Sequence, residues 1–175
     1  MKQHSTPGFR LMDMKHILLI LPLSLFLFGS CSAQENQDKT DGIQWMGFEE
    51  AVRRCDQQPR KLFIDVYTDW CGWCKRMDAG TFRDSAVVAY MNANYYAVKL
   101  DAETRDTLRF RENVFVFKPE YKTNELALSL LNGKLGYPSF VIMSEDYTIL
   151  RHLSGYQTRE ELMPVLQELS AYKRN

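Results

Sequence analysis

The pattern of apolar and polar residues predicts a domain in which helices and strands alternate. Phe48–Gln57 carries apolar side chains at a three-and-four spacing, which predicts an amphipathic helix that ends before Pro59. Residues 62–67 are apolar at nearly every position, as in a central strand covered on both faces. Residues 86–94, which Asp84 or the following serine can cap, predict another helix.

A second strand is predicted at residues 96–100. The strand–helix–strand order makes the two strands parallel, with a right-handed crossover. Residues 139–143 and 148–153 flank a short polar turn, which predicts an antiparallel hairpin after Pro138. A capping box that begins at Thr158 then opens the last helix.

The segment 102–133 has a less regular pattern. A charged stretch leads into the apolar patch 114–117, and a short helix is indicated at 125–131 before an Asn-Gly pair. We expect an elaboration of the domain here. The patch also motivates an alternative function, because exposed apolar residues within 105–121 would suit a protein partner.

The N-terminus has the pattern of an export signal. A short basic region precedes the uncharged apolar run 17–29, which is too short for a membrane span. We therefore expect residues 1–30 to be a signal peptide, in which 1–13 form an upstream extension. The polar stretch 31–42 would be a flexible tether, and residues 43–175 would form one domain.

Two processing sites compete at the end of this signal. Residues 27–31 resemble a bacterial lipobox, which implies cleavage before Cys31 and lipidation of that cysteine, although Phe28 replaces the usual aliphatic residue. The alternative is cleavage after Ala33, with Cys31 discarded. We favour the lipoprotein, tethered to a membrane on the periplasmic side of a bacterial cell envelope.

Composition excludes some classes of function. The 175 residues are 45% hydrophobic, and 22 Lys and Arg balance 22 Asp and Glu. Such a chain is typical of an ordinary globular domain. Because the charge is balanced and no dense basic cluster is present, we do not expect binding to nucleic acid.

The strongest chemical signal is the pair Cys71 and Cys74, directly after the predicted buried strand and at the start of a helix-like stretch. A C-x-x-C in this place is typical of reversible thiol–disulfide exchange. A zinc site needs four ligands, and the folded part adds only Cys55 and His152, so we expect no metal. A plain structural disulfide is a further alternative. Cys55 lies on an apolar helical stripe and is interpreted as a core residue.

The order of elements and these residues resemble the thioredoxin-like superfamily. The chain is most similar to exported disulfide reductases, including the C-terminal domain of the membrane disulfide interchange reductase. In those proteins a strand with a buried Asp leads into Trp-Cys-x-x-Cys-Lys, as residues 65–75 do here, and a Thr-Phe pair follows, like Thr81 and Phe82. The resemblance covers 44–169. It implies an α/β thioredoxin fold with a central mixed sheet flanked by helices and an insertion before a cis-proline hairpin.

Roles for the reacting groups follow. Cys71, at a helix N-terminus, would be the nucleophile, and Cys74 would be the resolving thiol of a Cys71–Cys74 redox disulfide. Asp65 interrupts an apolar strand, where burial would raise its proton affinity and let it accept the Cys74 proton. Lys99 matches a lysine that lies near this Asp in the family. The alternative is that both are solvated strand residues.

The resemblance also implies a substrate surface around the dithiol. Trp70 would supply an apolar platform, with Gly72 and Trp73 between the cysteines. The Tyr137–Pro138 bond would be cis and would expose backbone groups to an extended substrate. Trp73 stands where thioredoxin has proline, so it leaves the direction of electron flow open.

Together these features predict an exported thiol–disulfide oxidoreductase. We favour a reductase of protein disulfides over an oxidase or isomerase, and a reductase outside the cytoplasm needs a membrane electron donor. We expect a monomer without a cofactor. The alternative is a thioredoxin-fold interaction or chaperone-like protein that binds a partner through residues 105–121.

Overall fold

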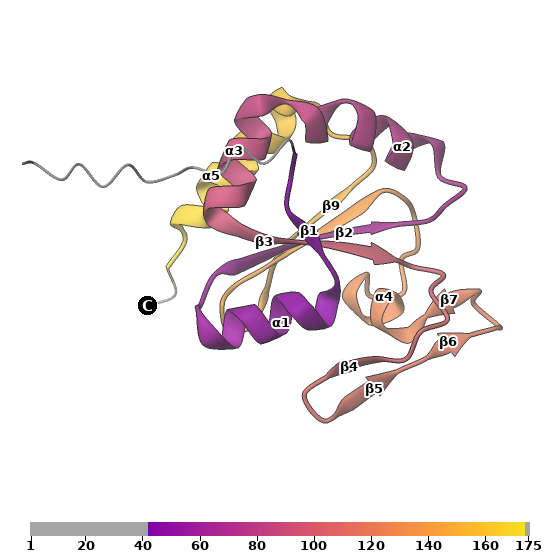
Figure 1. Cartoon of the computed structure of the whole chain (residues 1–175). Helices are drawn as coiled ribbons and strands as arrows, with labels where there is room; N and C mark the ends of the chain where they lie inside the picture. The colour runs from indigo at the N-terminus through magenta and orange to yellow at the C-terminus, as the bar shows by residue number, and fades with distance from the viewer. Residues whose placement is uncertain (1–41, 174–175) are drawn as a thin grey trace, which may run out of the picture. The chain divides into compact units, whose positions relative to one another are not determined.

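A five-stranded mixed sheet organises residues 42–173, the part of the chain that the computed structural model describes (Figure 1). Its strands, in spatial order, are β1 (Trp45–Met46), β3 (Tyr95–Asp101), β2 (Lys61–Tyr67), β8 (Ser139–Met143) and β9 (Ile149–Ser154). Strand β3 is parallel to β1 and β2, whereas β8 is antiparallel to β2 and β9. The predicted central position of β2 and its parallel pairing with β3 are therefore confirmed.

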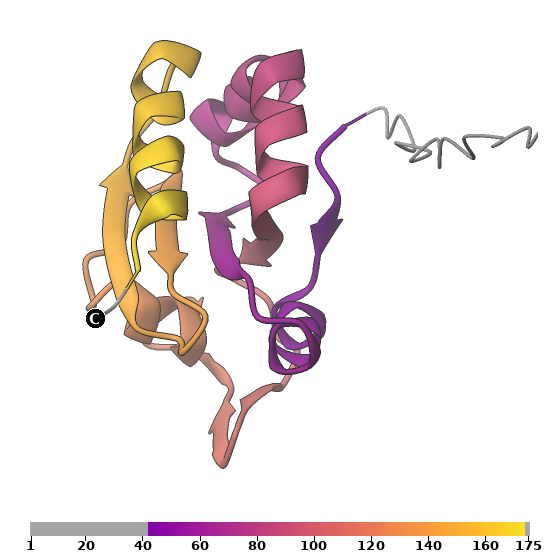
Figure 2. The ribbon, with the colours of Figure 1, turned by 90° about the vertical axis from the view of Figure 1, so that its left-hand side faces the viewer.

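Helices cover both faces of this sheet (Figures 1 and 2). One face carries α1 (Phe48–Gln57) and α4 (Glu125–Leu130), and the other carries α2 (Gly72–Ala79), the 3-10 turn η1 (Thr81–Arg83), α3 (Ser85–Asn94) and α5 (Arg159–Ala171). The two cores are separate clusters of buried side chains. Each face of the sheet is therefore closed by its own apolar layer.

Strand β2 divides its side chains between the two cores. Leu62, Ile64 and Val66 belong to the core beneath α1, whereas Phe63 belongs to the core beneath α2, α3 and α5. Successive strand residues point to opposite faces, so Asp65 points to the same side as Phe63. The carboxylate is thereby directed toward the helix layer that contains α2.

The helix ends follow from local sequence. The Asp84 side chain accepts hydrogen bonds from the backbone N–H groups of Ala86 and Val87, which caps α3. Thr158 and Glu161 form the predicted capping box of α5, each side chain accepting from the backbone of the other. These contacts satisfy backbone donors that the first helical turn leaves unpaired.

The insertion before Pro138 contains two small hairpins that the sequence pattern did not predict. They comprise β4 (Leu108–Phe110) with β5 (Asn113–Phe115), and β6 (Phe117–Lys118) with β7 (Thr123–Asn124). Phe110 packs edge-to-face against Phe48 of α1 and against Tyr147 in the β8–β9 turn. Part of the apolar insertion therefore belongs to the core.

The predicted signal peptide 1–30, the lipidation site Cys31 and nearly all of the tether 31–42 lie outside the described residues and stay predictions. Within residues 42–173, every helix is too short or too polar to cross a membrane.

Candidate active site

The dithiol lies at the start of α2, which follows β2 in the chain. Cys71 is the N-cap of α2, and its Sγ accepts a hydrogen bond from the backbone N–H of Cys74 at 3.0 Å. The two sulfurs are joined at 2.10 Å, so the structure describes the oxidised pair. Backbone donors and the helix dipole at this end favour a thiolate once the pair is reduced. The sequence therefore places the first cysteine where its nucleophilic form is stabilised.

The predicted pair Asp65 and Lys99 meets inside the domain. The two residues are directly opposite in the β2–β3 register, and Lys99 Nζ lies 2.7 Å from Asp65 Oδ2. Asp65 is 1% exposed, and within residues 42–173 its other oxygen, Oδ1, has no hydrogen-bond partner. Burial raises the pKa of the Asp65 carboxyl to about 6, although the Lys99 ammonium acts to lower it. Asp65 therefore holds its proton at a pH where an ordinary carboxyl has lost it.

A second carboxylate completes this cluster, and sequence reasoning missed it. Asp78, on the last turn of α2, accepts a hydrogen bond from Lys99 Nζ through Oδ1. Burial acts to lower the pKa of Lys99, but Asp65 and Asp78 together outweigh burial and raise it. The ammonium also lies within 5.6 Å of the ring centroids of Trp45, Tyr67 and Phe82. Lys99 is thus a permanently charged bridge between the two carboxylates.

This bridge leads to the surface. A cavity of about 360 Å³ is lined by Asp78, Lys99 and Arg83, together with apolar side chains that include Trp45 and Phe82. Asp78 is far more exposed than Asp65, with a side-chain exposure of 46% against 1%. The cavity therefore opens Lys99 and Asp78 to solvent, whereas Asp65 does not line it.

Replacing Asp78 by asparagine should lower the pKa of Asp65 by about half a unit. The Asp78 charge raises the Asp65 pKa directly, and without it Lys99 interacts with Asp65 alone. The Asp65 side-chain carboxyl carbon can be followed by NMR titration of the oxidised protein, in which the disulfide-bonded Cys71 and Cys74 do not titrate. Glu168→Gln, which removes an exposed carboxylate paired with Arg151, is the matched control. An unchanged Asp65 titration in Asp78→Asn would mean that the two carboxylates are not coupled.

The predicted substrate residues Trp70 and Tyr137 contact each other, and Pro138 directly precedes β8, the strand beside β2. The Tyr137–Pro138 bond is cis, as expected, and the Pro138 carbonyl accepts a hydrogen bond from Gly155 N–H at 2.8 Å. Trp70 is 66% exposed and packs edge-to-face on Tyr137, with 5.9 Å between the ring centroids. Its indole N–H donates to Glu103, which sequence reasoning did not single out.

Trp73 lies in a different aromatic contact. Its ring centroid is 5.7 Å from that of Tyr156, in the loop after β9, and the Arg76 guanidinium lies over both rings. Gly72, the other residue between the cysteines, is exposed at the start of α2. Tyr156 and Arg76 could not be assigned from the sequence, because nothing in their local pattern indicates a contact with Trp73.

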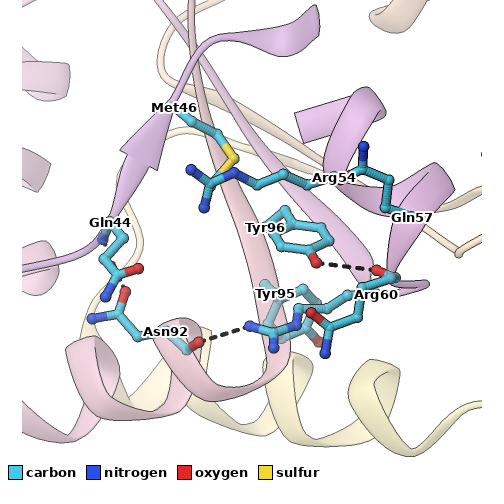
Figure 3. Close-up of a pocket in the computed structure, with 9 residues that line it drawn as sticks. Gln44, Met46, Arg54, Gln57, Arg60, Asn92, Tyr95 and Tyr96 are labelled. Carbon is cyan, nitrogen blue, oxygen red and sulfur yellow. Dashed lines mark hydrogen bonds between the residues drawn. The ribbon is translucent and has the colours of Figure 1, made fainter. Parts of the chain in front are cut away.

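A separate hollow of about 280 Å³ lies at the other end of the sheet (Figure 3). Arg60, directly before β2, donates to the backbone carbonyl of Asn92, and the Tyr96 hydroxyl donates to the Gln58 carbonyl, both at 3.0 Å. These polar groups satisfy one another. Because Cys71 follows the opposite end of β2, this hollow takes no part in the chemistry of the dithiol.

Comparison with known proteins gives one family. The family model Thioredox_DsbH, described as "Protein of unknown function, DUF255", matches residues 27–169. Among curated proteins, the thiol:disulfide interchange protein DsbD of Pseudoalteromonas atlantica is 31% identical over 67 residues, which are 38% of this chain and 11% of DsbD. An uncharacterized protein of Archaeoglobus fulgidus is 24% identical over 94 residues, which are 54% of this chain and 72% of that protein. The match thus spans about a tenth of the length of DsbD.

Solved structures confirm the predicted thioredoxin fold. A candidate disulphide isomerase from Bacteroides thetaiotaomicron is 26% identical, with a TM-score of 0.54 over 77% of this chain and 98% of that one. A thioredoxin from Thermus thermophilus is 17% identical, with a TM-score of 0.57 over 74% and 88%. A DsbH oxidoreductase is 16% identical, with a TM-score of 0.53 over 75% and 87%.

Proposed function

Because the chain belongs to the Thioredox_DsbH family, we propose that it is an exported thiol–disulfide oxidoreductase that reduces protein disulfides with Cys71 and Cys74. The observation that carries the proposal is the disulfide-bonded pair at the N-terminus of α2, on the sheet face toward which the buried Asp65 points. A plain structural disulfide would not require a buried carboxylate with a raised pKa on this face.

The first step is attack by the Cys71 thiolate on a substrate disulfide. A bond forms between Cys71 Sγ and one substrate sulfur, and the other substrate sulfur leaves as a thiolate that takes up a proton from solvent. The N-terminus of α2 stabilises the attacking thiolate relative to the thiol. Trp70 and the backbone at cis-Pro138 would hold the substrate segment during this step.

The second step resolves the mixed disulfide. Cys74 transfers its proton to the Asp65 carboxylate and attacks Cys71 Sγ, which forms the Cys71–Cys74 bond and releases the second substrate thiolate. The substrate gains two electrons and the dithiol loses two. A carboxyl with a pKa of about 6 is well matched to this proton transfer near neutral pH. Lys99, which Asp78 also holds, would position Asp65.

A reductase must then be reduced again. We infer a membrane-bound dithiol partner as the electron donor, because the chain resembles a segment of a thiol:disulfide interchange protein. Export through the signal 1–30 would place the monomer on the periplasmic side of the envelope, and lipidation of Cys31 would tether it there. No cofactor is needed, since the dithiol itself carries the electrons.

The reduction potential tests the direction of transfer. We expect the reduced protein to precipitate insulin by cleaving its disulfides, and the Cys71–Cys74 couple to lie below about −200 mV, nearer to thioredoxin at about −270 mV than to DsbA at about −120 mV. Equilibration with defined glutathione or dithiothreitol ratios gives the value. A couple above about −150 mV would identify an oxidase instead.

Partner binding through residues 105–121 is the second candidate function. It is supported by three exposed apolar side chains in or beside the insertion hairpins, those of Val114, Val116 and Tyr121. The insulin assay separates the two. If the reduced protein left insulin intact and the Cys71–Cys74 couple lay outside the oxidase range, partner binding would become the leading candidate.

A further inference from the structure

Two exposed indoles flank the dithiol, and each is held by a different tyrosine. Trp70 is 66% exposed and packs on Tyr137, whereas Trp73 is 55% exposed and packs on Tyr156. Large exposed aromatic side chains that are fixed by neighbours are typical of recognition surfaces. We call these two indoles and their tyrosines the indole surface.

The Trp70 end of the indole surface is acidic. Glu103 Oε1 accepts a hydrogen bond from the Trp70 indole N–H at 3.0 Å. Burial and then the neighbouring carboxylates of Asp69 and Glu103 raise the pKa of Asp101, although a backbone N–H of Glu103 offsets part of this. The three carboxylates therefore lie close enough to act as one negative region beside Trp70.

The Trp73 end is basic. The Arg76 guanidinium lies 5.5 Å from the ring centroid of Trp73 and 5.8 Å from that of Tyr156. The loop that carries Tyr156 is anchored, because Thr81 Oγ1 donates to the Gln157 carbonyl at 2.7 Å. The Arg76 guanidinium therefore lies against both rings, and Arg76 is exposed beside Trp73.

The sheet order separates these two ends. Glu103 follows β3, on one side of β2, whereas Tyr156 follows β9, two strands away on the other side. Cys71 follows β2 itself, so it lies between the acidic end and the basic end. A substrate segment across the dithiol meets charges of opposite sign on its two sides.

We propose that the indole surface selects disulfide-bonded polypeptides with a basic residue on the Trp70 side of the reacting cysteine and an acidic residue on the Trp73 side. Glu103 and Arg76 are the residues that set this preference. The inference rests on the proposed function and adds the substrate class. Charges at the rim of a contact surface act mainly on the rate of encounter and on orientation.

The test uses single turnover of the reduced protein with three short peptides. In each peptide the central cysteine is blocked as a mixed disulfide with neutral mercaptoethanol. The first peptide has Lys before and Glu after this cysteine, the second has the reverse order, and the third is uncharged. The Cys71–Cys74 dithiol gives two electrons, becomes a disulfide, and releases the peptide thiol and mercaptoethanol. No further reductant is therefore required.

We expect one charged peptide to react about three- to tenfold faster than its reverse at low salt, with the difference falling at high salt. The double variant Glu103→Lys with Arg76→Glu should invert the order, and Glu168→Gln should leave it unchanged. Equal rates for the two charged peptides, or an order that the double variant does not alter, would overturn the proposal. Failure of the wild-type protein to react with the uncharged peptide would instead count against the proposed function.

Discussion

Replacement of Cys71 by serine should reduce disulfide reduction by about three orders of magnitude or more, to the uncatalysed rate. A serine hydroxyl at the N-cap of α2 is not ionised at neutral pH, so the helix terminus has no thiolate to stabilise. Insulin reduction and the release of mercaptoethanol from a blocked peptide both measure this loss.

Replacement of Cys74 should give a different defect. Cys74→Ser leaves Cys71, the proposed nucleophile, in place but removes the thiol that we propose resolves the mixed disulfide. Substrate should therefore accumulate covalently on Cys71, as a band that disappears on reduction in gel electrophoresis.

Cys55→Ser is the matched control for both variants. Cys55 is the free, buried cysteine of the described residues, and its Sγ donates to the Arg60 carbonyl, a contact that serine can also make. The control should keep full activity. Equal activity of Cys71→Ser and Cys55→Ser would refute the role of the dithiol.

Replacement of Asp65 by asparagine should stabilise the protein at pH 7.5 by roughly 1–3 kcal/mol. The Asp65 pKa rises from 3.8 to about 6 on folding, so the folded protein binds this proton more tightly than the unfolded chain. The contribution of Asp65 to the free energy of unfolding is therefore complete below about pH 3.8 and is lost as the pH rises through about 6. Asparagine is neutral throughout, and Lys99 keeps Asp78 as its partner.

Urea unfolding of the oxidised protein at pH 4.5 and pH 7.5 measures this effect. From pH 4.5 to pH 7.5, the wild-type protein should lose the part of its free energy of unfolding that Asp65 contributes. Asp65→Asn should show no such loss. Asp106→Asn, at an exposed position of the insertion, controls for the change from carboxylate to amide. A variant that was less stable than wild type at pH 7.5 would mean that the ion pair with Lys99 outweighs the burial of the carboxylate.

The same variant should be slower in catalysis. If Asp65 accepts the Cys74 proton as we propose, its loss should slow the resolution step by about a hundredfold or more at neutral pH. The first attack by Cys71 should change much less. Stopped-flow measurement of the lifetime of the mixed disulfide separates the two steps, and equal slowing of both would argue against a role for Asp65 in resolution.

Much of the fold could be predicted because its central strand has a strong local pattern. The apolar run at β2 indicated burial on both faces, and the polar Asp65 within it marked the site. The pairing of Asp65 with Lys99 came from the resemblance, and the β2–β3 register places them opposite one another. Strands of two or three residues, such as β1 and β4, are too short for a period of two to be recognised.

The missed site residues share a physical reason. Asp78 is a half-exposed carboxylate on a helix, which from sequence indicates only a solvated face. Its role depends on Lys99, which reaches it from a strand of the sheet. Tyr156 likewise contacts Trp73 only because the loop after β9 lies against α2. Contacts between distant segments leave no local periodicity, so they emerge only from the fold.

The insertion hairpin has an evolutionary consequence. Phe110 fills the space between Phe48 and Tyr147, and Glu49 accepts a hydrogen bond from the Arg109 backbone at 2.8 Å. Strand β4 is thus fixed to α1 and to the β8–β9 turn at the end that leads into the tip, whereas the tip itself, at residues 111–112, is exposed. Descendants of this chain could lengthen the exposed turn if Phe110 and Arg111 kept their places against Tyr147, but loss of the whole hairpin would uncover the core and require compensating changes in both neighbours.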